Sequence, residues 1–361
     1  MKLPADRLVH IGIVVKDLRQ SAKSLAKMYG IAAWDVISLT ERRLTSSVTR
    51  GYKSEPTFKF AIGRASTTNG DIVFKLVEPL EGWSIFKEHL ITRGEGIHHI
   101  CTAAISPDEF DGLKPWLKSQ RVTVAQSGCI DEKLDFHFLD TRERLGGFYI
   151  ELLCPRDAVT TELPPDEHWD LSSDVPSAGP VMPITDLRHF GVVVNNLVDR
   201  VIDWAELFGI KSWEFRNWRT EPGSLEAPTN NGQLVNHAYF TTMATLKPAL
   251  TFELIQPTFG PSHYKEDYLH QIGEGIHHVF TSAPPNEAAW HALRERAAEV
   301  GVPVVMSGGL GNEFLHFYYL DTRKILPGYV TEALCPGRNH VPGVRPTFEV
   351  AMTADLTVPT I

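Results

Sequence analysis

The sequence predicts an α+β protein that arose by tandem duplication. Each copy should contain two modules, and each module one strand, one helix and about three further strands. The first observation is a repeated phrase, because Gly-Glu-Gly-Ile-His-His occupies residues 94–99 and again residues 273–278. The second observation is a set of landmarks that recur in the same order: HIGIVV with HFGVVV, LDTR with LDTR, and LCP with LCP. The third is a half-repeat, since 89 residues separate His10 from His99 and His189 from His278.

The elements of the modules follow from the apolar pattern. Each module opens with an apolar strand that carries a histidine, and an amphipathic stretch follows it. Apolar residues at helical spacing predict helices at 18–31, 107–119, 197–210 and 285–301. Gly30 and Gly209 are the expected C-terminal caps of the first and third helices. Short apolar runs bounded by Gly, Pro and Asn predict strands at 57–63, 71–79, 134–140, 147–155, 237–243, 250–257, 314–321 and 328–336.

The repeat also sets the domain boundaries. We expect an N-terminal domain over residues 1–155 and a C-terminal domain over residues 185–340. The segment between them, 156–184, is rich in Pro, Asp and Ser and lacks periodicity, which is typical of a linker. Residues 341–361 form the predicted C-terminal tail.

Composition excludes several classes of function. The net charge is −9 and no run of five basic residues occurs, which argues against nucleic-acid binding and against an anionic membrane surface. We find neither a secretory signal nor an apolar run of about 18 residues that could span a membrane. The four scattered cysteines, with no Cys-x-x-Cys pair, are expected to be reduced thiols. A cytoplasmic protein is the expectation, and a homodimer is left open.

Ionisable residues stand in strands where an apolar run predicts none. Glu253 lies within Leu-Thr-Phe-Glu-Leu-Ile, Glu151 and Glu332 hold matching places in the last strand of each copy, and His10 and His189 open their strands. A buried carboxylate is costly unless it is paired, hydrogen-bonded or bound to a metal. Imidazole and carboxylate are suitable ligands for divalent transition metals. Strand alternation sends the neighbours of each His-His pair to opposite faces, but periodicity does not say which one faces a site.

These motifs resemble the vicinal oxygen chelate superfamily, which includes glyoxalases, bleomycin resistance proteins and dioxygenases. The resemblance covers residues 6–155 and 185–337, and it rests on HIGIVVKDL with HFGVVVNNL, GEGIHHI with GEGIHHV, and GGFYIELLCP with GYVTEALCP. It implies tandem glyoxalase-like domains, with four βαβββ modules that form curved mixed sheets around a metal cavity. Methylmalonyl-CoA epimerase is the most similar type, because of the His-His pair and the Leu-Asp-Thr-Arg approach to the last strand.

The resemblance also implies a ligand set in the C-terminal copy. Carried over position by position, the metal ligands are His189, Glu253, His278 and Glu332. They would hold one divalent ion per chain, which could be Zn, Fe, Mn, Co or Ni. Glu332 is also a candidate proton-transferring base. His237 lies close to where the epimerases of the family carry an acid/base residue, although Asn236 competes for that place.

The N-terminal copy departs from the pattern at one position. His10, His99 and Glu151 match the ligands, but Lys75 stands where the C-terminal copy has Glu253. A protonated lysine has no lone pair and repels a cation. We therefore expect Lys75 to pair with Glu151 and this copy to be metal-free. A three-ligand iron site formed by the two histidines and Glu151 is the alternative.

The predicted function is a metal-dependent epimerase or isomerase that moves a proton on the carbon next to a carbonyl group. Its partner would be a small carbonyl compound, such as an acyl-CoA or a cyclic or sugar-like ketone. An iron-dependent dioxygenase of the same superfamily is the main alternative. A glyoxalase-type isomerase would use the same ligand types. A non-enzymatic sequestering protein would usually lack such ligands.

Overall fold

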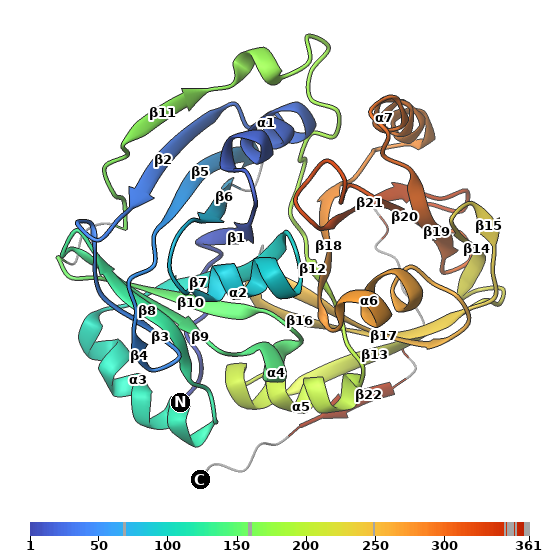
Figure 1. The fold of residues 1–361 in the computed structure, drawn as a ribbon. Coiled ribbons are helices and arrows are strands. Elements are labelled where there is room, and N and C mark those ends of the chain that lie inside the picture. The colour runs from blue at the N-terminus through green and yellow to red at the C-terminus, as the bar shows by residue number, and fades with distance from the viewer. Residues whose placement is uncertain are drawn as a thin grey trace. The chain divides into compact units, whose positions relative to one another are not determined.

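The computed structural model describes residues 1–67, 70–157, 161–247, 250–342, 344, 350 and 352–356. The chain forms two compact units. Unit 1 contains Met1–Pro180 together with Leu326–Gly328, and unit 2 contains Val181–Ile325 together with Tyr329–Ile361. Each unit has one mixed sheet of 11 strands with a few helices, so the predicted α+β class and the tandem duplication are confirmed (Figure 1).

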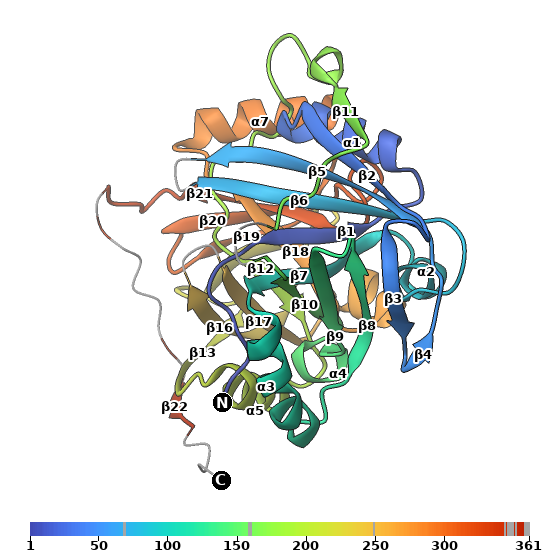
Figure 2. The same ribbon diagram turned by 90° about the vertical axis from the view of Figure 1, so that its left-hand side faces the viewer.

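The elements of unit 1 occur in the following order along the chain: β1 (His10–Val14), α1 (Leu18–Tyr29), β2 (Ala33–Leu39), β3 (Leu44–Thr49), β4 (Tyr52–Lys53), β5 (Phe58–Thr67), β6 (Gly70–Pro79), α2 (Ile85–Thr92), β7 (Gly96–Ala104), α3 (Pro107–Ser119), β8 (Val124–Ile130), β9 (Leu134–Leu139), α4 (Arg142–Leu145), β10 (Tyr149–Pro155), β11 (Glu167–Asp170) and the 3-10 turn η1 (Ser172–Asp174). The strand order in the sheet is β11-β2-β5-β6-β1-β7-β10-β9-β8-β3-β4. Figure 2 shows β5, β6 and β1 side by side within it.

The elements of unit 2 repeat this plan: β12 (Phe190–Val193), α5 (Leu197–Phe208), β13 (Ser212–Arg219), β14 (Leu225–Asn230), β15 (Gln233–Leu234), β16 (Ala238–Lys247), β17 (Leu250–Phe259), the π-helical turn η2 (Lys265–Leu269), α6 (His270–Ile272), β18 (Gly275–Ser282), α7 (Glu287–Glu299), β19 (Val304–Leu310), β20 (Leu315–Leu320), β21 (Val330–Pro336) and β22 (Met352–Asp355). The strand order is β15-β14-β19-β20-β21-β18-β12-β17-β16-β13-β22, which is the order of unit 1 read from the other end.

The centre of each sheet joins the two modules of a copy. In unit 1, β1 runs parallel to β6 and antiparallel to β7. In unit 2, β12 runs parallel to β17 and antiparallel to β18. The histidine-bearing first strands of the two modules are therefore direct neighbours, although 89 positions separate their histidines in the sequence.

The helix caps agree with the sequence. Asp17 and Asn196 accept hydrogen bonds from backbone N–H groups at the starts of α1 and α5. Gly30 and Gly209 end these helices in the left-handed conformation, with φ of 81° and 73°. A residue with a Cβ is strained there, which explains a glycine at the same place in both copies.

The predicted linker and tail contain more structure than their composition indicated. Residues Glu167–Asp170 of the linker form β11, which pairs antiparallel with β2. In the tail, Met352–Asp355 forms β22, which pairs with β13, while residues 343, 345–349, 351 and 357–361 lie outside the described residues. These strands are only four residues long and mostly exposed, so they show little hydrophobic periodicity. Their pairing satisfies an otherwise open sheet edge.

Two further observations bear on earlier expectations. All four cysteines are free and buried, which confirms that they do not form a disulfide framework. No helix in the described part of the chain has the length and apolar character needed to cross a membrane.

Candidate metal centre

Four predicted ligands converge at the centre of the unit 2 sheet. Glu253 on β17 and His278 on β18 both lie opposite Gly191 of β12, and Glu332 on β21 lies opposite Phe280 of β18. His189 directly precedes β12. Nε2 of His189 lies 2.8 Å from Oε2 of Glu332 and 3.7 Å from Oε2 of Glu253. Nε2 of His278 lies 3.4 Å from Oε2 of Glu332 and 3.8 Å from Oε2 of Glu253.

The glycine between these strands explains the His-x-Gly pattern. A Cβ placed on Gly191 would lie 1.8 Å from Cε1 of His278 and 2.2 Å from its Nε2. Gly12 has the same relation to His99 in unit 1, where the Cβ would lie 1.9 Å from Nε2. The imidazole therefore rests on the neighbouring strand, and only glycine leaves the space for it.

The donor atoms suit one divalent ion. Ligands about 2.1 Å from a common ion are about 3.0 Å apart when they meet at right angles and about 3.4 Å apart in a tetrahedron. The Nε2 atoms of His189 and His278 lie 3.4 Å apart, and the carboxylate distances span 2.8 to 3.8 Å. Oε2 of Glu332 is buried and has no hydrogen-bond partner of acceptable geometry. A buried carboxylate oxygen that lies 2.8 and 3.4 Å from two imidazole nitrogens without a well-directed hydrogen bond fits a cation ligand.

The electrostatics of the group point the same way. Burial, opposed by His189 and assisted by the charge of Glu332, raises the pKa of Glu253 to about 7. For Glu332, burial acts to raise the pKa, but His189 and His278 outweigh it and the pKa is lowered. One carboxyl group thus holds a proton in place of a cation until near neutral pH. A divalent ion would supply the positive charge that both carboxylates lack.

The His-His pair differs from its expected geometry. Strand alternation predicts that His277 and His278 face opposite sides of the sheet, but their Nδ1 atoms lie only 3.0 Å apart. The reason is a β-bulge, because Gly191 pairs with His278 and Val192 pairs with Ile276, which leaves His277 as the extra residue. Both imidazoles are buried, and His278 is the member whose Nε2 meets the other donors.

His237, the predicted acid/base residue, is buried directly before β16. Its Nδ1 lies 3.2 Å from the carbonyl oxygen of Pro261. A carbonyl only accepts, so Nδ1 carries the proton and Nε2 keeps a free lone pair. That Nε2 is buried without a hydrogen-bond partner. The ring packs against Tyr239, with centroids 5.7 Å apart, and its described contacts do not include the four donors.

Three residues near the centre were not singled out from the sequence. The ring of Tyr319 lies 4.7 Å from that of His278, and its hydroxyl is 2.6 Å from the hydroxyl of Tyr264. His263 and Arg323 are joined to His277 by hydrogen bonds. The repeated Leu-Asp-Thr-Arg landmark contained Arg323, so the repeat could have identified it. His263 has no histidine counterpart in the first copy, where Ser84 matches Ser262 and Ile85 stands at the place of His263, and no pattern marked it.

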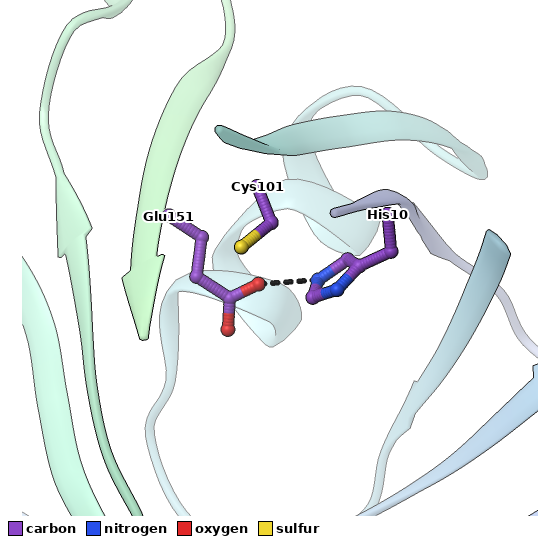
Figure 3. A group of neighbouring side chains, drawn as sticks. All are labelled: His10, Cys101 and Glu151. Atoms are coloured by element: carbon purple, nitrogen blue, oxygen red, sulfur yellow. Dashed lines mark hydrogen bonds and ion pairs between the residues drawn. The ribbon is translucent and has the colours of Figure 1, made fainter. Parts of the chain in front are cut away.

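The equivalent place in unit 1 is filled by an ion pair. Nζ of Lys75 lies 3.0 Å from Oε1 of Glu151, as expected from the sequence. The other oxygen of Glu151 is 2.5 Å from Nε2 of His10 and 3.2 Å from Nε2 of His99. Figure 3 shows His10 and Cys101 converging on this carboxylate. Burial raises the pKa of the Cys101 thiol well above its usual range, so the sulfur is protonated.

A cavity of about 370 Å³ adjoins this ion pair. His10, Lys75 and Glu151 line it together with apolar side chains such as Phe60, Ile130 and Phe136. Lys75 is only 8 % exposed, so its charge depends on Glu151 for compensation. The group has two imidazoles and one carboxylate, but an ammonium group stands where unit 2 presents a second carboxylate.

The comparisons with known proteins agree with this fold. Residues 9–139 match the family model of the glyoxalase/bleomycin resistance protein/dioxygenase superfamily. A mutant of 4-hydroxymandelate synthase from Streptomyces coelicolor has a similar structure, with a TM-score of 0.54, 13 % identity and 95 % of both chains covered. This likeness extends the duplicated fold over the whole chain. A search of curated proteins gave no match.

Two further solved structures have lower TM-scores, and one of them matches less than half of this chain. The Mn(II)-bound glyoxalase from Novosphingobium aromaticivorans has a TM-score of 0.44 and 14 % identity, and the match covers 92 % of this chain and 82 % of that one. Methylmalonyl-CoA epimerase from Streptomyces coelicolor has a TM-score of 0.31 and 22 % identity, and the match covers 44 % of this chain and 100 % of that one.

Proposed function

Because residues 9–139 match the family model of the glyoxalase/bleomycin resistance protein/dioxygenase superfamily and the chain has a duplicated fold, we propose that the C-terminal copy is a metal-dependent epimerase or isomerase. It removes a proton from the carbon next to a carbonyl group of a small molecule and returns it. The observation that carries this proposal is the complete set of donors at His189, Glu253, His278 and Glu332, which unit 1 lacks.

The donor set defines the chemistry of the centre. When bound, one Zn, Fe, Mn, Co or Ni ion per chain supplies a Lewis acid that stabilises negative charge on a carbonyl oxygen. The two imidazoles and two carboxylates provide four ligands, so a six-coordinate ion keeps two positions for substrate oxygen or water. Both Glu253 and Glu332 must be ionised for this role, and the ion itself favours that state.

Two side chains of this copy are candidates to move the proton. Oε2 of Glu332 makes no well-directed hydrogen bond and adjoins both imidazoles, which makes it a possible base at the centre itself. Nε2 of His237 is unprotonated, since its Nδ1 donates to Pro261. Burial lowers the pKa of His237, which keeps that nitrogen free to accept a proton at neutral pH. A positioned base of this kind typically accelerates a reaction by about 10²–10⁴-fold.

The test combines metal analysis with isotope exchange. Protein purified without added metal should contain about one divalent ion per chain, and Glu253→Ala should lose it. The loaded protein should exchange the α-hydrogen of an acyl-CoA or of a cyclic ketone for deuterium in D₂O. Absence of any bound ion, or ion binding without exchange on either substrate class, would argue against an epimerase or isomerase.

A specific feature keeps an iron-dependent dioxygenase as the second candidate. His189, His278 and Glu332 form the tightest donor group, whereas Glu253 lies farther away and holds its proton up to about pH 7. If Glu253 does not coordinate the ion, two histidines and one carboxylate remain as ligands, which is the ligand set of many non-haem iron oxygenases. Oxygen consumption by the iron-loaded protein, with no deuterium exchange, would favour this candidate.

A further inference from the structure

A series of three hydrogen-bonded histidines leads away from the candidate metal centre. Nδ1 of His278 lies 3.0 Å from Nδ1 of His277, and Nε2 of His277 lies 2.7 Å from Nδ1 of His263. Nε2 of His263 lies 3.0 Å from Nη2 of Arg323. We call His278, His277 and His263 the histidine series. It joins a side chain with no solvent exposure to an arginine whose side chain is 25 % exposed.

Arg323 is held firmly at the outer end of the series. Its Nε and Nη2 donate to the two carboxylate oxygens of Asp321 at 2.7 and 2.8 Å. Its Nη1 donates to the carbonyl oxygen of Asp267 at 3.1 Å. One hydrogen of Nη2 serves Asp321, and the other points to His263. A guanidinium group has five donors and no acceptor, so Nε2 of His263 must accept.

This fixed donor determines the direction of every other hydrogen bond. An imidazole ring keeps at least one proton, so a ring that accepts a hydrogen bond at one nitrogen carries its proton on the other nitrogen. If Nε2 of His263 accepts, its Nδ1 donates to His277. His277 then donates through Nδ1 to His278, and His278 is left with its own proton on Nε2.

The result conflicts with metal binding at His278. Nε2 of His278 is the atom that meets Glu332 and Glu253, and a nitrogen that carries a proton cannot ligate an ion. Loading the centre requires the His278 proton to be on Nδ1. His277 must then carry its proton on Nε2, and His263 on Nε2 as well. The proton on Nε2 of His263 would then face Nη2 of Arg323, which is also a donor, so the hydrogen bond between these two atoms would be lost.

We propose that Arg323 and His263 are positioning residues that set, through His277, which nitrogen of His278 is free to bind an ion. An ion at Nε2 of His278 reverses the histidine series and separates Arg323 from His263. Three protons change nitrogen within their own rings and none is gained or lost overall. The inference rests on the proposed metal-binding role of His278, but the direction of the series in the metal-free protein does not depend on it.

The first copy provides an internal comparison. His98 and His99 make the same contact, with Nδ1 atoms 2.9 Å apart. Ile85 replaces His263, because Ser84 corresponds to Ser262: each serine hydroxyl accepts a hydrogen bond from the backbone N–H three residues later, that of Lys87 or of Lys265. Nε2 of His98 is buried without a partner. Within the described residues, the series reaches an arginine only in the copy with four complete donors.

The packing around His277 makes the series rigid enough to transmit this preference. The rings of Tyr264 and Tyr268 both lie 5.1 Å from the ring of His277. The hydroxyl of Tyr268 donates to the carbonyl oxygen of Ile276, and the hydroxyl of Tyr264 bonds that of Tyr319. The imidazole cannot turn over without displacing these rings, so a change of tautomer is the available response.

The direct test is the tautomeric state of each ring, read from ¹⁵N-labelled histidine by NMR. Metal-free protein should show protons on Nδ1 of His263, Nδ1 of His277 and Nε2 of His278. Addition of Zn²⁺ should move the proton of His277 to Nε2. The opposite tautomers in the metal-free protein, or bound zinc with His277 unchanged, would overturn the inference. No zinc binding by the wild type would instead refute the metal centre itself.

Two variants separate hydrogen-bond direction from charge. His263→Ser removes the imidazole between His277 and Arg323 and keeps the arginine, while Arg323→Met removes the donor and its charge. Each removes one hydrogen bond that opposes loading, so both should tighten Zn²⁺ binding about tenfold. Arg142→Met removes the corresponding arginine of unit 1, which pairs with Asp140, and should leave zinc affinity unchanged. Unchanged or weaker affinity in His263→Ser would overturn the inference.

Discussion

Lys75 and Glu151 form a buried ion pair, with Nζ 3.0 Å from Oε1, at the place where the other copy presents Glu253. The sheet register proves the correspondence, because Lys75 lies opposite Gly12 and Glu253 lies opposite Gly191. Unit 1 thus neutralises its central carboxylate with the ammonium group of a lysine side chain. Unit 2 has a carboxylate at that position and can accept a metal ion instead.

Removal of this ammonium group should destabilise the protein strongly. Lys75→Met leaves the buried carboxylate of Glu151 with only the imidazoles of His10 and His99 as partners, and loss of the charged partner of a buried pair typically costs about 3–5 kcal/mol. Chemical denaturation followed by circular dichroism would measure the free energy of unfolding. Lys53→Met removes an 85 % exposed lysine that pairs with Glu55, and should change it by less than about 1 kcal/mol. Equal effects of the two substitutions would contradict the structural importance of the buried pair.

Lys75→Glu should create a second metal site. The substitution gives unit 1 the same residue types as unit 2, namely two histidines and two glutamates on equivalent strands. The number of zinc ions per chain should rise from one to two by elemental analysis after dialysis. Two ions in the unsubstituted protein would show instead that the Lys75–Glu151 pair does not exclude a metal.

Gly191→Ala should abolish metal binding at unit 2. The added methyl group would lie 1.8 Å from Cε1 of His278 and would push the imidazole off the neighbouring strand. Isothermal titration with Zn²⁺ should detect at least a 100-fold loss of affinity, which corresponds to about 2.7 kcal/mol. Gly12→Ala makes the same change against His99 and is the matched control. If zinc binding survived Gly191→Ala and failed in Gly12→Ala, the ion would bind in unit 1 and the proposed site in unit 2 would be wrong.

Metal affinity should decrease as the pH falls below about 7. The folded protein without metal holds a proton on Glu253 up to a pKa of about 7, whereas ion binding needs the carboxylate. His189, whose pKa is raised by Glu332 against the effect of burial, competes in the same direction. Affinity should therefore fall about tenfold for each pH unit below 7 if one proton competes. Glu253→Gln should flatten this slope, and a slope that is flat in the wild type would contradict the shifted pKa.

His237→Gln should slow proton exchange while the metal stays bound. If Nε2 of His237 is the base, the rate constant should drop about 10²–10⁴-fold and the zinc content should remain one per chain. In the wild type, the hydrogen bond from Nδ1 to the carbonyl oxygen of Pro261 holds the imidazole ring in place. The side-chain amide of the glutamine does not reproduce this hydrogen bond. An unchanged exchange rate would transfer the role of base to Glu332.

His189, Glu253 and Glu332 stood out in the sequence as ionisable residues in apolar strands, and the duplication marked Lys75 as the single mismatch. The complete set of candidate donors, with His278 rather than His277, required the resemblance to the vicinal oxygen chelate superfamily. The bulge at His277 could not be predicted, since one extra residue in a strand leaves the local hydrophobic pattern unchanged. Strands β11 and β22 were not predicted for a related reason, because short and exposed edge strands have no apolar face and so show no hydrophobic periodicity.

The sequence by itself determined the repeat, the modules and which residue types line each centre, since these depend on periodicity and on composition at matched positions. Only the tertiary structure decided that the imidazoles of one His-His pair touch each other, and that His263 and Arg323 continue the hydrogen bonds outward. These relations join strands, a turn and a loop that are distant in the sequence. Local propensity has no information about such distances, because the paired groups meet only after the sheet has formed.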